Sequence, residues 1–214
     1  MNLRLKRIHI FLLALPLFFM QGCIEITERI DVNEDRSGSI SLSVSISEGN
    51  LLLGLIKFGG EVDVLDDVED VAEGYAGLLS VSDGIHNVKV MRDKKNESVR
   101  LSFDFDNQRQ LNRALYAAAG LQKTLFKPAV YKVKAKSFRK MNMTPLLEML
   151  LEEEGQEILP SFINYTYEIN LPRSAKSVSV KNATLLHDGH TVKYRGNVAD
   201  ILEKKSKTGI KIKF

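Results

Sequence analysis

Cysteine is almost absent from this chain of 214 residues, which contains Cys23 and no other. A disulfide within one copy of the chain is therefore excluded, although an exported compartment would permit one. Zinc sites usually need three or four ligands, and no second thiolate is available to supply one. The fold must be held by its apolar core, which 44% hydrophobic residues can provide.

The short motifs of the common catalytic classes are also missing. The sequence has no His-Glu-x-x-His, no Gly-x-Ser-x-Gly, no phosphate-binding Walker loop and no Gly-x-Gly-x-x-Gly. His187 and His190 flank a tight Asp188-Gly189 turn, but two imidazoles are too few for a zinc site. We therefore expect no catalytic residue, no metal and no cofactor. A hydrolase whose Ser, His and Asp converge from distant positions is the alternative.

No apolar run is long enough to span a bilayer, which takes about 20 residues. The longest run, from Ile10 to Met20, is interrupted by Pro16. It follows a basic start and leads into Gln21-Gly22-Cys23. A basic start, an apolar middle and a small-residue exit are the three parts of a secretory signal peptide. We expect residues 1–22 to be removed and residues 23–214 to form a single exported domain.

The same stretch resembles the signal of bacterial lipoproteins, whose lipobox ends in a small residue and the cysteine that receives lipid. Gly22 and Cys23 match these last two positions. The resemblance implies that Cys23 is the first residue of the mature chain and carries acyl chains such as palmitate. It also implies a bacterial envelope protein, anchored on the extracytoplasmic side of the outer or cytoplasmic membrane.

The net charge of the chain is small, but the charged residues are segregated along it. The formal charge is +3, and the signal removes three basic residues, Arg4, Lys6 and Arg7, so the mature chain is neutral. This excludes a typical nucleic-acid binder, which keeps a basic excess. The stretch 107–147 nevertheless contains basic residues and no acidic one. Its basic residues are Arg109, Arg113, Lys123, Lys127, Lys132, Lys134, Lys136, Arg139 and Lys140.

Hydrophobic periodicity predicts an α+β fold, an antiparallel sheet built from hairpins with three or four helices packed on it. The expected strands are 24–33, 39–47, 86–91, 98–105, 130–136, 162–171, 177–186, 190–195 and 209–214. The expected helices are 61–79, one capped by Asp106 or Asn107, one starting at Thr144-Pro145, and a short one at 198–204. The apolar segment 51–58 is expected to pack in the core or to touch a membrane. A ββα order occurs twice, at 24–80 and 85–121, and indicates two ββα-like subunits of the one domain.

Several turn residues resemble those of the LppM type of extracytoplasmic lipoprotein. They are Asn33, Asp35, Ser37, Gly38, Ser39, Leu171, Pro172, Asp188, Gly189 and Val192. The resemblance implies a membrane-anchored α+β domain in contact with lipid, and it carries no catalytic residue over to this chain.

Alternating lysines suggest the functional surface. Lys132, Lys134 and Lys136 share one strand face by the two-residue period, and Lys211 and Lys213 repeat the arrangement. If these strands are neighbours, they form, with Arg139 and Lys140, a patch that contacts an anionic surface. A solvated sheet face, or lysines that protect an edge strand, is the alternative. We therefore expect a non-enzymatic anchored module that binds anionic lipid, an envelope polymer or a partner protein, and no nucleic acid.

Overall fold

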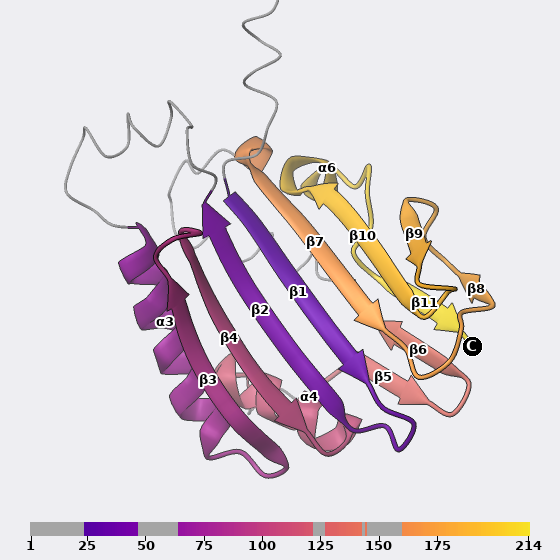
Figure 1. Ribbon diagram of the computed structural model, residues 1–214, viewed down its shortest axis with the longest axis horizontal. Coiled ribbons are helices and arrows are strands. Elements are labelled where there is room, and N and C mark those ends of the chain that lie inside the picture. Colours follow the sequence, from indigo (N-terminus) through magenta and orange to yellow (C-terminus); the bar gives the residue numbers. More distant parts are fainter. Residues whose placement is uncertain (1–23, 47–63, 122–126, 143, 145–159) are drawn as a thin grey trace, which may run out of the picture.

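Figure 1 shows the computed structural model, which describes residues 24–46, 64–121, 127–142, 144 and 160–214. It contains a seven-stranded sheet, called the large sheet here, and a four-stranded one, called the small sheet. The large sheet has the order β3-β4-β2-β1-β7-β10-β9 and the small sheet β5-β6-β11-β8. The strands of the large sheet are β3 Ile85–Asp93, β4 Ser98–Phe105, β2 Gly38–Ile46, β1 Ile24–Val32, β7 Ile163–Asn170, β10 Thr191–Asn197 and β9 Ala183–Leu186. Those of the small sheet are β5 Tyr131–Lys134, β6 Ser137–Lys140, β11 Ile210–Lys213 and β8 Ser177–Val178.

The first hairpin, β1 and β2, forms as the alternating apolar residues predict. Its strands are antiparallel, and Ile30 lies opposite Ile40 with both side chains buried. In the connecting turn, the Asp35 carboxylate accepts hydrogen bonds from the backbone N–H and the hydroxyl of Ser37, at 2.9 and 2.6 Å. A Cβ on Gly38 would lie 2.0 Å from the Asp31 carbonyl oxygen, so only glycine fits at the start of β2.

The large sheet is not purely antiparallel, because β7 runs parallel to its neighbour β1 over eight residue pairs, from Ile24 and Ile163 onward. The expected all-antiparallel sheet is wrong at this pair. Hairpins can only produce antiparallel neighbours, whereas a long crossover can return the chain in the same direction. Here the chain from β4 passes through a helix and the first two strands of the small sheet before it enters β7.

The small sheet contains a hairpin where a single strand was expected. The predicted strand 130–136 ends at Lys134, the chain turns at Ala135 and Lys136, and β6 runs back antiparallel to β5. The predicted strand 177–186 is also divided: β8 pairs with β11, and β9 pairs with β10. The loop between β9 and β10 spans residues 187–190, so it is longer than the predicted two-residue turn.

Three α-helices are described, together with one turn of 3-10 helix. They are α3 Val64–Ser80, α4 Gln108–Ala118, α6 Val198–Leu202 and η1 Pro160–Phe162. The side chain of Asn107 caps α4, as predicted, by accepting from the backbone N–H groups of Arg109 and Gln110. The segment 51–58 and the helix expected after Thr144-Pro145 lie outside the described residues.

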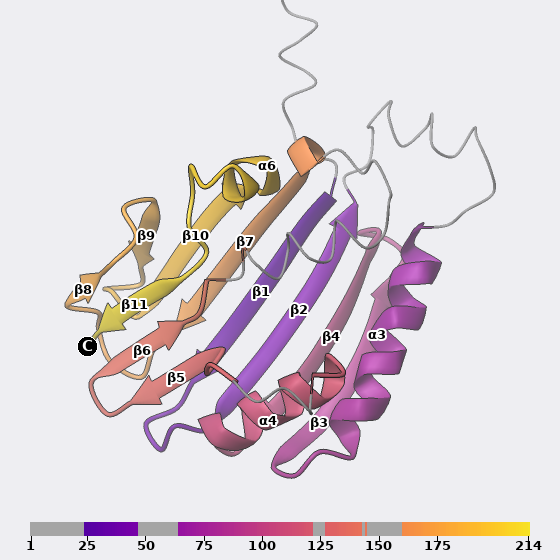
Figure 2. The same ribbon diagram turned by 180° about the vertical axis from the view of Figure 1, so that it is seen from behind.

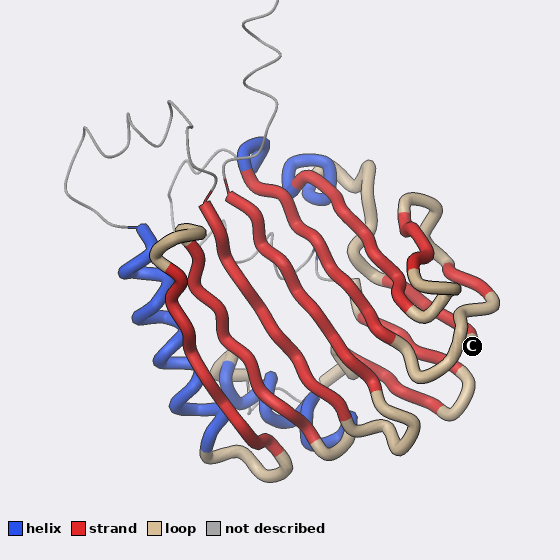
Figure 3. The backbone as a smooth tube through the Cα atoms, viewed as in Figure 1, coloured by secondary structure: helices blue, strands red, loops and turns tan. Residues whose placement is uncertain are grey.

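The elements form two layers. Figure 2 shows β5, β6, β11 and α4 in front of the large sheet, with α3 along β3 and β4. Figure 3 shows the strands of the large sheet side by side, with the helices at its margins and behind it. The core lies between the layers and includes Ile30 and Tyr167 from the large sheet, Phe138 and Ile212 from the small sheet, and Leu111 from α4. Within the described residues, no helix is long and apolar enough to cross a membrane.

Candidate functional site

The outer face of the small sheet is basic because β5 and β11 alternate between buried apolar residues and exposed lysines, and β6 adds the exposed Arg139. Along β11, Ile210 and Ile212 are buried while Lys211 and Lys213 are exposed. The outward side chains of β5, β6 and β11, with Lys136 from the β5–β6 turn, line a hollow of about 410 Å³. We call this surface the basic face; its residues are Lys132, Lys134, Lys136, Ser137, Arg139, Lys211 and Lys213.

The strand register arranges these cations in two rows. Arg139 on β6 lies opposite Lys132 on β5 and opposite Lys211 on β11. In the second row, Ser137 lies between Lys134 and Lys213. β6 therefore separates the two lysine-bearing strands, which the sequence had suggested as direct neighbours, and its Arg139 adds a cation between them.

Such rows are unfavourable for the free protein. Adjacent strands are about 4.8 Å apart, and like charges directly opposite each other destabilise a sheet. Among the described residues, no carboxylate lies within 4.0 Å of a cation of the basic face. An anion bound across the rows would relieve the repulsion, so the arrangement favours binding of multiply charged anions.

Two of the predicted contact residues lie elsewhere than expected. Lys136 belongs to the β5–β6 turn and not to a strand, although it still lines the basic face. Lys140 is wrong as a surface contact, because its side chain points between the layers and the residue is only 1% exposed. Its position on β6 has the same parity as the buried Phe138, so the two-residue period sends it inward.

Lys140 belongs to a buried polar cluster that joins the two sheets. Its ammonium lies 3.3 Å from the Glu28 carboxylate on β1 and 5.3 Å from the centre of the Tyr165 ring on β7. Glu28 also accepts hydrogen bonds from the hydroxyls of Tyr131, at 2.7 Å, and of Tyr165. Burial, followed by the charge of Glu28, raises the pKa of Tyr131 and of Tyr165 well above the ordinary tyrosine value.

Glu28 was not identified from the sequence as a buried residue, although its position in the strand pattern indicates one. It occupies the inward phase of β1, between the partly buried Ile26 and the buried Ile30. A carboxylate in the apolar phase of a strand indicates either a break in the strand or a buried, paired charge. Its partner Lys140 is far away in sequence, so only the fold brings the two together.

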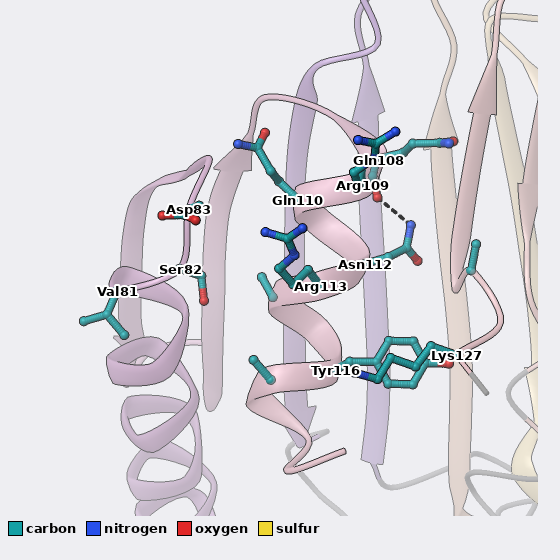
Figure 4. A pocket seen from close by; sticks show the side chains of 13 residues that line it. Val81, Ser82, Asp83, Gln108, Arg109, Gln110, Asn112, Arg113, Tyr116 and Lys127 are labelled. Carbon is teal, nitrogen blue, oxygen red and sulfur yellow. Dashed lines mark hydrogen bonds between the residues drawn. The ribbon is translucent and has the colours of Figure 1, made fainter. Parts of the chain in front are cut away.

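A second groove lies beside α4 (Figure 4). It has a volume of about 730 Å³, and its lining includes Arg109, Arg113, Ser82, Asp83 and Tyr116. The neighbouring stripe of α4 binds the edge of β5: Asn112 accepts from the Tyr131 N–H at 3.0 Å and donates to the Tyr131 carbonyl at 2.7 Å.

The Asn112 side-chain amide takes the place of a neighbouring strand at the β5 edge. It fixes α4, and with it Arg109 and Arg113, next to the small sheet. The two arginines are four residues apart and so lie on one side of the helix.

Among the described residues, no histidine hydrogen-bonds to both a carboxylate and a hydroxyl. His86 on β3 lies 3.1 Å from the Asp106 carboxylate, and both side chains are about half exposed, at 56% and 54%. His190 contacts the Leu171 carbonyl oxygen at 3.2 Å. Within the described residues, neither His187 nor His190 hydrogen-bonds to a carboxylate or a hydroxyl. The same part of the chain holds no group of three or more His, Cys, Asp or Glu suited to a metal ion.

The comparison with known proteins finds similarity among solved structures alone. No protein-family model and no curated protein matches the chain. Among solved structures, it is similar to the folded domain of LppM from Mycobacterium tuberculosis, with 11% identity, 90% of each chain covered and a TM-score of 0.40. LppM represents the type that the turn residues resemble, but a likeness at this level carries no conclusion about this chain.

Proposed function

We propose that this protein is a bacterial envelope lipoprotein, anchored through acyl chains on Cys23, whose exported domain binds anionic lipid head groups without catalysing a reaction. The observation that carries the proposal is the row formed by Lys132, Arg139 and Lys211. Three cations on adjacent strands, with no acidic partner among the described residues, present an unneutralised surface of one sign.

The expected binding strength follows from the number of charges. A lysine or arginine near an anionic membrane surface contributes about 1 kcal/mol. Arg139 adds geometric fit, because a guanidinium binds phosphate oxygens in pairs. The lysines act as point charges on flexible stems and suit head groups in varied positions. Binding by these groups must weaken with salt, since exposed charges are screened over about 8 Å at physiological ionic strength.

The test measures binding of the chain from Ile24 onward to vesicles of phosphatidylcholine alone or mixed with phosphatidylglycerol. We expect salt-sensitive binding to the anionic vesicles only. Replacing Lys132, Arg139 and Lys211 together by Gln should weaken it by about 100-fold, the equivalent of about 3 kcal/mol.

A matched control removes the same amount of positive charge from the β3 edge of the large sheet. Lys89, Lys94 and Lys95 are exposed there, on β3 and in the turn that follows it. Replacing them by Gln should leave vesicle binding nearly unchanged. Equal binding to both kinds of vesicle, or an equal loss in the two triple variants, would show that the basic face is ordinary solvated surface.

A further inference from the structure

We propose that the anionic lipid surface bound by the basic face belongs to a second bilayer, facing the one that holds Cys23. The protein would then link two membrane surfaces. This inference rests on the proposed function and adds the identity of the partner surface. It follows from where the basic face lies relative to Ile24, the residue that directly follows the anchor.

The basic face lies at the half of β1 remote from the anchor. Tyr131 and Lys140, the inward neighbours of Lys132 and Arg139, both contact Glu28 in the middle of β1. Lys134 lines a small cleft together with Val32, the last residue of that strand. With a rise of about 3.3 Å per residue, Glu28 and Val32 lie about 13 and 26 Å from Ile24. If the domain stands upright on its anchored end, the distance between the basic face and the anchoring membrane exceeds one screening length of about 8 Å.

If the domain lay with its basic face on a membrane, the anchor at Cys23 would not reach that same membrane. Ile24 belongs to the large sheet, whereas the cations project from the outer side of the small sheet. The small sheet lies in front of the large one in Figure 2. Packed sheets are about 10 Å apart, and the length of the lysine side chains adds to this. A single peptide bond joins Cys23, the proposed anchor, to Ile24, the first residue of β1. No linker is therefore present between them that could span the distance from the large sheet to the outer side of the small sheet.

The anchored end of the domain also carries the wrong charge for an anionic leaflet. Across the sheet, Ile26 lies level with Val44, Val99 and Arg92. Arg92 contacts Asp66 and Glu69 near the start of α3, which places that helix end beside the anchored end. Three more carboxylates along this part of the helix, Asp67, Asp70 and Glu73, are exposed. The β3–β4 turn at the same end adds the exposed Lys94 and Lys95, which these carboxylates outnumber. An anionic leaflet would repel this end, whereas it attracts the basic face.

The test uses the chain from Cys23 onward, which contains every described helix and strand. Its only cysteine is coupled to a maleimide lipid in neutral phosphatidylcholine vesicles, which reproduces the anchor at its natural position. Unlabelled vesicles containing phosphatidylglycerol are then added, and clustering is followed by light scattering. Amine-reactive labelling read by mass spectrometry reports whether Lys132 and Lys211 are covered. In a parallel arm, the anchoring vesicles themselves contain phosphatidylglycerol.

We expect clustering that weakens with salt and falls at least tenfold when Lys132, Arg139 and Lys211 become Gln, but not when Lys89, Lys94 and Lys95 do. We expect Lys132 and Lys211 to stay reactive on anionic anchoring vesicles and to become covered only when separate anionic vesicles are added. Absence of clustering, with both lysines covered on the anchoring vesicles, would overturn the inference while leaving the proposed function intact. If the uncoupled domain binds polyphosphate but no anionic vesicle, both proposals are overturned and the partner is a polymer.

Discussion

Single residues determine the turns that set the strand register. The loop between β9 and β10 holds three successive residues at positive φ: His187 at 51°, Asp188 at 54° and Gly189 at 85°. This conformation costs least for glycine and most for a β-branched residue. Asp188 and Gly189, the pair expected to form a tight turn, both lie at positive φ, although the loop is longer than two residues.

Replacing Gly189 by Val should lower the free energy of unfolding by about 1 kcal/mol or more, because valine resists the left-handed conformation. A Cβ at this position would meet nothing closer than 3.5 Å, so the cost comes from the backbone and not from a clash. Urea denaturation measures it. The matched control is Gly77→Ala on exposed α3, where a Cβ meets nothing within 4 Å. That change should stabilise by about 0.5–1 kcal/mol; equal effects at the two sites would contradict the argument.

At the scale of the elements, a buried ion pair joins the two sheets. The ion pair between Glu28 of β1 and Lys140 of β6 links the large sheet to the small one across the core. Two desolvated charges stabilise little when paired, but either one left alone in the interior costs several kcal/mol. The pair therefore specifies how the two sheets dock more than it adds to stability.

We expect Glu28→Leu and Lys140→Met each to destabilise the protein by about 3–5 kcal/mol, since each leaves the other charge buried without its partner. The double variant should recover most of this loss. A double-mutant cycle from urea denaturation gives the coupling. If the two single losses simply add in the double variant, the charges do not interact through the pair.

The tyrosines around Glu28 predict how stability depends on alkaline pH. Burial raises the pKa of Tyr131, Tyr165 and Tyr167, so the folded state keeps three protons that the unfolded state releases near pH 10. Their contribution to stability is full below pH 10 and is lost as the pH rises above it. Phenolate absorbance should show these three tyrosines ionising only with unfolding, monitored by circular dichroism. Normal titration of all six tyrosines in the folded protein would rule this out.

At the scale of the whole molecule, acidic and basic charges lie at different places along β1. The carboxylates of α3 flank the end of the large sheet where β1 begins, and the basic face lies along the remote half of β1. The domain thereby has two surfaces of opposite sign. If Cys23 is the anchor, as proposed, the acidic surface is the one that faces the anchoring membrane.

Replacing Cys23 by Ser should release the protein from the membrane, or leave residues 1–22 uncleaved, because the lipid site is lost. Stable anchoring needs more than one acyl chain, and the lipoprotein signal implies several on this cysteine. Fractionation of envelopes and the mass of the mature chain measure both effects. A cleaved Cys23→Ser chain that stays in the membrane fraction would place the anchor elsewhere.

The alternation of apolar and polar residues determined most strands of this protein, because each strand buries one side against a core. It also determined that Lys132 and Lys134 share one face of β5, and that Lys211 and Lys213 share one face of β11. The caps and turns followed from local chemistry, as at Asn107 and in the loop around Gly189.

Only the tertiary structure decided what lies beside what. The parallel pairing of β1 with β7, the insertion of β6 with Arg139 between the two lysine strands, and the burial of Lys140 against Glu28 all depend on long-range contacts. Local periodicity gives the side on which a residue lies but not the partner that it meets there. A lysine therefore looks the same in sequence whether its sheet face meets solvent or a buried carboxylate, and the packing of the two layers alone distinguishes them.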